Sequence, residues 1–87
     1  MSDPLIQRLR AQIAQQDRTI LTAINERLRL VAELKRHKEA EGLPFADPDQ
    51  EERLLHALDD ANAGPLSRED LRRLFAEILA LTKRETG

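Results

Sequence analysis

The chain has 87 residues, enough for one small domain over residues 1–87 but too few to bury much surface without a partner or a cross-link. It contains no cysteine, which excludes disulfides and thiolate metal sites. Its 14 basic and 16 acidic residues give a net charge of −2, and there are two Phe and no Trp or Tyr. Such a composition argues against nucleic-acid binding, which needs excess positive charge and aromatic stacking.

The N-terminal segment has no apolar signal core, and no apolar run reaches the roughly 18 residues that a membrane span needs. A soluble, cytoplasmic protein without membrane contacts is therefore expected. The abundance of Ala, Leu, Glu, Arg and Gln favours helices.

The first expected element is one very long helix over residues 4–41. Asp3 followed by Pro4 is a typical helix start, since Asp can cap the helix and Pro fits its first turn. Neither Gly nor Pro occurs again before Gly42, which we expect to form the C-cap. Pro44 prevents the helix from continuing.

Two shorter helices should follow. Asp47 and Pro48 repeat the start signal, and Gln50 stands where a capping box would place it, which predicts a helix over residues 48–61. The segment "NAGPL" predicts a turn, and Ser67 should cap a third helix with the apolar spacing of "LRRLFAEILAL". No stretch has the alternation of a strand, so the fold class is all-α with three helices and a very long first helix.

The first helix is too long for a compact monomer. Its 38 residues should span about 57 Å, whereas a domain of this size has a radius of gyration near 12 Å. A simple coiled-coil arm is disfavoured because Gln16, Asp17 and Arg27 interrupt its seam. We therefore expect an intertwined homodimer that buries both long helices. The alternative is a break near Gln15–Asp17 that would create a four-helix bundle.

Long cations lie in line with the apolar stripe of this helix. Arg27 and Lys38 are eleven residues apart, which is about 20° of rotation, so they share the face of Val31 and Leu34. Arg10 lies about 100° around the helix from Arg27, so the two can meet easily only if Arg10 comes from a partner chain. Buried cations are costly unless they are paired, so carboxylates or an anionic ligand should lie nearby.

Each charged residue also has a purely structural interpretation. Arg27 can lay its stem over the core with its head in water, and Lys38 can complement the helix dipole. Asp47 can be only an N-cap, with Gln50 and Glu51 as ordinary first-turn residues. The segment "TKRE" near the end can be a frayed, charged terminus.

The sequence contains no pattern that indicates a metal site, a phosphate-binding loop or nucleophilic catalysis. His37 and His56 are isolated, no His, Asp and Glu set has metal-ligand spacing, and no Gly-rich phosphate loop occurs. No Ser lies beside a His for nucleophilic catalysis. A cationic pocket of this kind suits a small polyanion, or a reaction without covalent catalysis or cofactor.

Four segments together carry a family resemblance that spans nearly the whole chain: "LRAQIAQQD", "ERLRLVAELKRHK", "GLPFADPDQEERLL" and "LFAEILALTKRE". The chain resembles the all-helical, AroQ-type chorismate mutases. The resemblance implies the type II chorismate mutase fold, an intertwined homodimer with two shared active sites. It also implies the cofactor-free rearrangement of chorismate to prephenate in aromatic amino-acid synthesis.

The resemblance also implies roles for cations of the long helix. Arg27, and Arg10 from the partner, would grip the substrate carboxylates, for which a guanidinium fork is well suited. Lys38 would donate to the ether oxygen and to a carboxylate.

The remaining implied contacts come from the other two helices. Asp47 and Glu51 would bind the ring hydroxyl region and hold the cations in place. Thr82 lies where the family often has a Ser that touches a carboxylate.

Two positions depart from the family pattern. Gln50 stands where the family usually has an Arg, so this substrate contact would be neutral. Thr86 stands where the family often has Gln or Glu facing the ether oxygen. Losing one charge-assisted contact costs about 1.5–3 kcal/mol, which predicts a modest mutase. Some small mutases of this family are activated by another shikimate-pathway enzyme, and a weak site is compatible with such a partner.

Two alternatives stay open at this point. Isochorismate pyruvate lyases and aminodeoxychorismate mutases also resemble this family, and the Lys38 position and the loop of residues 42–46 would separate them. The chain could also be a non-catalytic dimeric helical module with a regulatory role, an interpretation that Gln50 and Thr86 favour.

Overall fold

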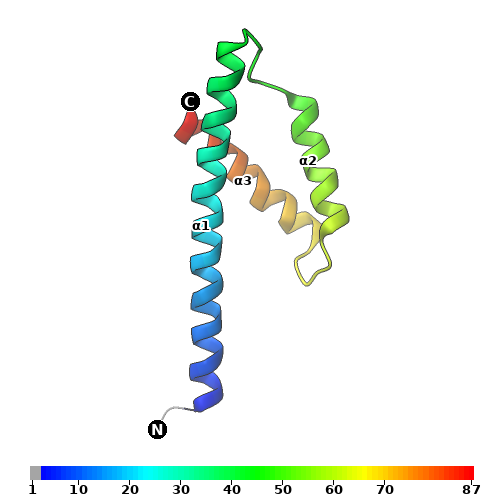
Figure 1. Cartoon of the computed structure of the whole chain (residues 1–87). Helices are drawn as coiled ribbons and strands as arrows, with labels where there is room; N and C mark the ends of the chain where they lie inside the picture. The colour runs from blue at the N-terminus through cyan, green and yellow to red at the C-terminus, as the bar shows by residue number, and fades with distance from the viewer. Residues whose placement is uncertain (1–2) are drawn as a thin grey trace.

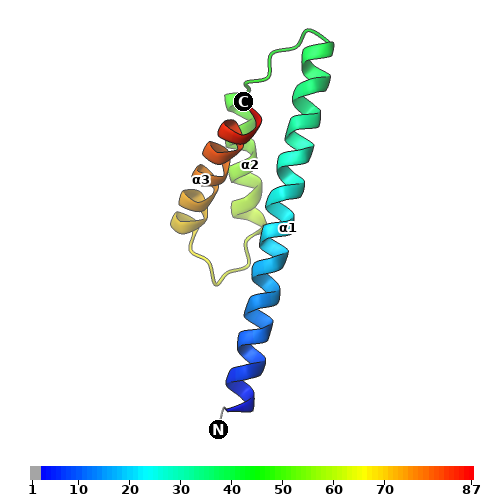
Figure 2. The same cartoon turned by 90° about the vertical axis from the view of Figure 1, so that its left-hand side faces the viewer.

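The computed structural model describes residues 3–87 as three α-helices: α1 (Pro4–Ala40), α2 (Pro48–Ala61) and α3 (Arg68–Thr86). Helix α1 runs the length of the molecule, and α2 and α3 form a hairpin that folds back on its C-terminal half (Figures 1 and 2). Residues 3–87 contain no strand, and no helix among them has the continuous apolar stretch that a membrane span requires. The all-α class with a very long first helix is confirmed.

All three helices begin where side-chain caps predicted. The carboxylate of Asp3 accepts a hydrogen bond from the Leu5 amide at 2.8 Å. The carboxylate of Asp47 and the hydroxyl of Ser67 each accept a hydrogen bond from the backbone amide three residues later in the chain, both at 3.1 Å. These bonds satisfy amide groups that otherwise have no partner in a first helical turn.

A Schellman motif ends α1. The amide of Gly42 donates to the Glu39 carbonyl at 3.2 Å, and the amide of Leu43 donates to the Lys38 carbonyl at 2.8 Å. Gly42 has a φ of 71°, a left-handed conformation that glycine adopts without steric cost. The capping residue itself is Glu41, so Gly42 follows the cap and does not form it.

Three details correct the sequence-based expectations. Helix α1 is continuous through Gln15–Asp17, so the four-helix alternative is wrong. The capping box is only half formed, because the Gln50 side-chain oxygen accepts from Arg53 and not from the start of α2. The segment "TKRE" is helical in α3 and not a frayed end.

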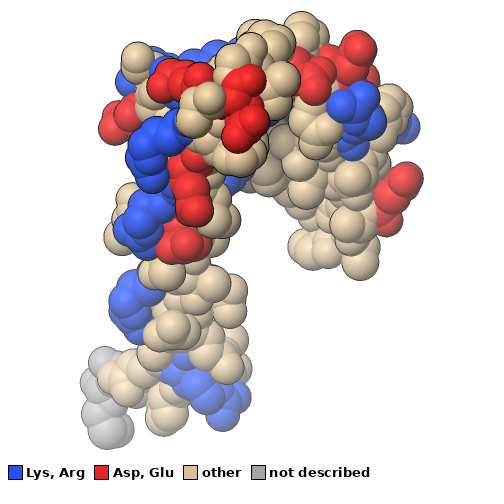
Figure 3. Space-filling model, turned by 45° about the horizontal axis from the view of Figure 1, so that its top comes forward, with Lys and Arg blue, Asp and Glu red and all other residues tan. Residues whose placement is uncertain are grey.

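A single chain has almost no core. It measures 62 × 24 × 18 Å with a radius of gyration of 17.1 Å, against about 12 Å for a compact domain of this length. Within residues 3–87 only Leu71 and Thr82 are buried. In space-filling form the N-terminal part of α1 and the hairpin are two arms that join at one end of the molecule (Figure 3). Large apolar side chains are exposed along α1: Leu5, Ile6, Leu9, Ile13, Ile20, Leu21, Leu30 and Leu34.

The α2–α3 hairpin is held by an ion cluster around Asp59. Its carboxylate accepts from Arg72 at 2.8 Å and from Arg68 at 3.2 Å, and the Asp59 side chain is only 9% exposed. The hydrogen bond from Arg72 is the chief cause that lowers the pKa of Asp59. This cluster fixes how α3 returns along α2 and therefore where the end of α3 meets α1.

Candidate active site

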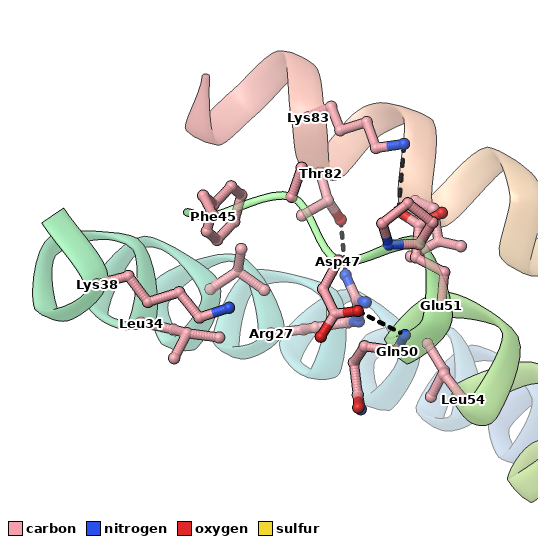
Figure 4. Close-up of a pocket in the computed structure, with 14 residues that line it drawn as sticks. Arg27, Leu34, Lys38, Phe45, Asp47, Gln50, Glu51, Leu54, Thr82 and Lys83 are labelled. Carbon is pink, nitrogen blue, oxygen red and sulfur yellow. Dashed lines mark hydrogen bonds and ion pairs between the residues drawn. The ribbon is translucent and has the colours of Figure 1, made fainter. Parts of the chain in front are cut away.

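A cavity of about 520 Å³ lies where α1, the start of α2 and the end of α3 converge (Figure 4). The loop between α1 and α2 closes one side of it. Charged, polar and apolar side chains from the three helices and from this loop form its walls: Arg27, Val31, Leu34, Lys38, Phe45, Ala46, Asp47, Pro48, Gln50, Glu51, Leu54, Leu79, Thr82 and Lys83.

Helix α1 contributes a single face to the cavity. Arg27, Val31, Leu34 and Lys38 are separated by steps of four, three and four residues, which keeps them on one side of a helix. The two cations therefore stand at either end of a short apolar strip. This arrangement is the one that the cation spacing predicted.

Arg27 is anchored by α3. Its guanidinium donates to the hydroxyl of Thr82 at 2.6 Å, and that hydroxyl donates in turn to the Ile78 carbonyl at 2.7 Å. Thr82 is only 6% exposed, so water does not compete strongly for its hydroxyl. The bond fixes the direction in which Arg27 presents its remaining N–H groups.

The first turn of α2 brings two polar side chains to the cavity. Asp47 keeps one carboxylate oxygen on the Gln50 amide, and its other oxygen lies 3.6 Å from the Arg53 guanidinium. Arg53 also donates to the Gln50 side-chain oxygen at 2.9 and 3.1 Å. Arg53 therefore orients both side chains from outside the cavity wall.

An ion pair joins α2 to α3 across the cavity. The ammonium of Lys83 lies 3.2 Å from the carboxylate of Glu51 (Figure 4). Sequence reasoning assigned Glu51 to the site but missed Lys83. The available signal was its helical spacing, since Lys83 follows Leu79 by four residues and shares its face.

The loop contributes Phe45. Its ring lies beside two α1 cations, with the Lys35 and Lys38 ammonium groups 5.7 and 5.8 Å from the ring centre. A ring face attracts cations at this range. Sequence reasoning missed this residue too, although it is the only aromatic side chain between the first two helices.

Of the eight residues predicted for the site, the structure brings six together: Arg27, Lys38, Asp47, Gln50, Glu51 and Thr82. Thr86 does not line the cavity; its hydroxyl donates to the Thr82 carbonyl and its own carbonyl accepts from Lys35 at 2.9 Å. Arg10 lies seventeen residues before Arg27 in the same helix, about 26 Å along its axis. Arg10 therefore cannot reach the cavity of its own chain.

The charge and shape of the cavity favour a small anion. Three cations and two carboxylates line it, and most of the other walls are apolar. Within residues 3–87 no three His, Asp or Glu side chains gather as a metal-binding group. The arrangement can hold an anionic molecule in one conformation and place positive charge at two separate points on it.

Comparison of the chain with known proteins points to one family. The family model for chorismate mutase type II matches residues 9–86. The chain is 38% identical over 77 residues to a bifunctional chorismate mutase/prephenate dehydratase of Stutzerimonas stutzeri, with 83% of this chain and 21% of that protein covered. The chain thus spans about a fifth of the length of that curated relative.

Two solved structures share the fold. Both are of chorismate mutase from Thermus thermophilus, named form II and form I, and each superposes with a TM-score of 0.84. Form II is 40% identical, with 91% of this chain and 90% of that chain covered. Form I is 42% identical, with 88% and 96% covered.

Proposed function

This chain belongs to the chorismate mutase type II family, and we propose that it rearranges chorismate to prephenate in the cavity between its three helices. The observation that carries this proposal is the pairing of Arg27, anchored on Thr82, with Lys38 in one cavity. A dicarboxylate needs cations at two separate points, and these residues provide them from one rigid helix. The volume of about 520 Å³ lies within the usual range for small-molecule sites.

The reaction makes few chemical demands on the protein. It is a unimolecular [3,3] shift in which one carbon–oxygen bond breaks as one carbon–carbon bond forms, without proton transfer. Catalysis then consists of holding the substrate in its compact conformer and stabilising the charge that develops on the ether oxygen. Neither task calls for a nucleophile or a cofactor.

The cations of α1 take the principal roles. Arg27 binds a carboxylate with a guanidinium that Thr82 has already oriented, so little side-chain entropy is lost on binding. Lys38 donates to the ether oxygen as negative charge grows there. Its ammonium has no carboxylate within 4.0 Å among residues 3–87, so it is available to a ligand.

The polar residues of α2 bind the other end of the substrate. Asp47 and Glu51 accept hydrogen bonds from the ring hydroxyl and balance the cations around it. Gln50 offers a neutral contact to a carboxylate. A neutral contact is weaker than a charge-assisted one, which is why we expect a modest rate from this site.

The threonines of α3 act mainly through their neighbours. The Thr82 hydroxyl is engaged with Arg27 and the Ile78 carbonyl, so it positions Arg27 for a carboxylate. Thr86 donates to the Thr82 carbonyl and supports the last turn of α3 from outside the cavity.

A second copy of the chain completes the site. The exposed surface of one chain is 7125 Å². A compact monomer of 9.9 kDa would expose about 5,200 Å², which leaves roughly 1,900 Å² in excess. Burying that excess on each of two chains gives an interface of the size of obligate homodimers. The apolar side of α1 supplies this surface, and an intertwined arrangement can bring Arg10 of one chain to the cavity of the other.

The proposal is tested by following the loss of chorismate absorbance with purified protein, and prephenate formation in parallel. Turnover should fall by up to about a hundredfold in Arg27→Ala, because a charge-assisted contact acting in the transition state is lost. Arg29→Ala is the matched control, since Arg29 is exposed, pairs with Glu26 and lies outside the cavity. It should keep wild-type activity.

A wild type without chorismate turnover would contradict the proposal. Assays with isochorismate and aminodeoxychorismate would then identify a related activity on the same scaffold, and addition of other shikimate-pathway enzymes would reveal an activating partner.

A separate experiment tests whether the two chains of a dimer share their active sites. Inactive Arg10→Ala and Arg27→Ala chains, unfolded and refolded together, should regain activity, because one site in every mixed dimer keeps both arginines.

A further inference from the structure

We propose that Lys83 is an additional substrate-binding residue, which offsets the charge of Glu51 and supplies the cation that position 50 lacks. This inference rests on the function proposed above and concerns the same cavity. It assigns a role to a residue that the cation pattern of α1 could not reveal.

Lys83 lies in the cavity wall beside Glu51. Lys83 lines the cavity directly after Thr82 in the last turns of α3. Its ammonium reaches across to α2 and lies 3.2 Å from Glu51, as Figure 4 shows. Among residues 3–87 no other cation lies within 4.0 Å of the Glu51 carboxylate. Lys83 is therefore the group of this chain that neutralises Glu51.

The charge balance of the cavity depends on Lys83. Arg27, Lys38 and Lys83 are the cations among the lining residues, and Asp47 and Glu51 are the anions. The cavity of one chain therefore has a net charge of +1, and without Lys83 it would have none. A dianionic substrate needs a positive surplus, so removing Lys83 should weaken binding directly.

The ion pair between Lys83 and Glu51 contributes little to the stability of the fold. The Lys83 side chain is 67% exposed, and ion pairs this accessible contribute little to stability. Position 50, on the α2 wall, holds a neutral amide whose oxygen is taken by Arg53. The cavity thus lacks positive charge on α2, and Lys83 provides it from α3.

The experiment compares Lys83→Met with Arg84→Met. Arg84 is the matched control, since it is the next residue, is 63% exposed, pairs with Glu77 and does not line the cavity. Lys83→Met should raise KM for chorismate about tenfold or more with a smaller change in kcat, because the carboxylates are charged in both ground and transition states. Arg84→Met should leave both constants unchanged. Thermal melts by circular dichroism should show both variants folded.

Rescue gives a second readout. Lys83→Arg should keep KM near the wild-type value, and adding Gln50→Arg to Lys83→Met should recover most of the lost affinity. Equal KM values for Lys83→Met and Arg84→Met would overturn the inference, as would a lower KM in Lys83→Met.

Calorimetric titration with prephenate separates this inference from the proposed function. If the wild type does not turn over chorismate but binds prephenate, the mutase proposal fails while Lys83 can still be judged. About tenfold weaker binding by Lys83→Met than by Arg84→Met would then support its role. Equal binding by the two variants, or no binding by the wild type, would overturn it.

Discussion

The guanidinium of Arg27 in α1 donates a 2.6 Å hydrogen bond to the hydroxyl of Thr82 in α3, fifty-five residues later in the chain. The bond joins the first helix to the last between two residues that line the cavity. It is also one of the few polar links in the molecule that is shielded from water, because Thr82 is one of two buried residues between residues 3 and 87. Arg27 is therefore held in place before any ligand binds.

Thr82→Val should lower kcat/KM by roughly tenfold to a hundredfold, because Arg27 loses an acceptor worth about 1.5–3 kcal/mol to a charged donor. The shape of the side chain changes little, so the fold should be kept. Steady-state assays with chorismate measure the effect. Thr82→Ser is the control, since it retains the hydroxyl and should behave like the wild type. A Val variant as active as the Ser variant would remove Thr82 from the site.

Gln50→Arg should raise kcat/KM about tenfold, because a charge-assisted bond to a carboxylate replaces a neutral one. The same assay measures it. Gln50→Met is the control, since it changes the side chain without adding charge and should give no gain. Equal rates for the Arg and Met variants would mean that position 50 does not contact the substrate.

Ile13→Glu should dissociate the proposed dimer, because Ile13 is 61% exposed on the apolar side of α1 and a buried, unpaired carboxylate is costly. Sedimentation equilibrium should show monomers, and the melting temperature should fall and lose the dependence on protein concentration that a dimer shows. Ala11→Glu introduces the same residue about 200° around the helix, on the opposite side, and should leave the dimer intact. Dissociation in both variants, or in neither, would contradict a dimer built on this side of α1.

Asp59→Asn should lower the melting temperature at pH 7. It should also make the melting temperature fall less steeply as the pH is lowered. The pKa of Asp59 is lowered, first by the hydrogen bond from Arg72, so the folded state binds the proton less readily than the unfolded state. The resulting stability is present above the unfolded pKa of about 3.9 and is lost as the pH falls through the lower folded pKa. Melting curves from pH 7 to pH 2 measure it.

The neighbouring Asp60 provides the control for this prediction, since it is exposed. Asp60→Asn should keep both the wild-type melting temperature at pH 7 and its fall in acid. An Asp59→Asn variant with an unchanged acid transition would show that the Asp59 cluster does not stabilise the hairpin.

Local chemistry allowed the helices to be predicted. Asp3, Asp47 and Ser67 begin the three helices, and Gly42 with Pro44 ends the first, because caps and turns involve residues only a few positions apart. Likewise, the step from Arg27 to Lys38 follows helical periodicity alone. The length of α1 also indicated that a single chain cannot cover it, and the extended dimensions agree with this.

The sequence by itself therefore determined the helices, their caps and the cationic face of α1, since each depends on short-range geometry. Only the tertiary structure decided which side chains meet that face. The crossing of α3 over α1 brings Thr82 to Arg27, and the α2–α3 hairpin brings Lys83 to Glu51. The same crossing leaves Thr86 outside the cavity, one turn beyond Thr82. Such pairings depend on how packed helices are placed and rotated, which residue spacing within one helix does not specify.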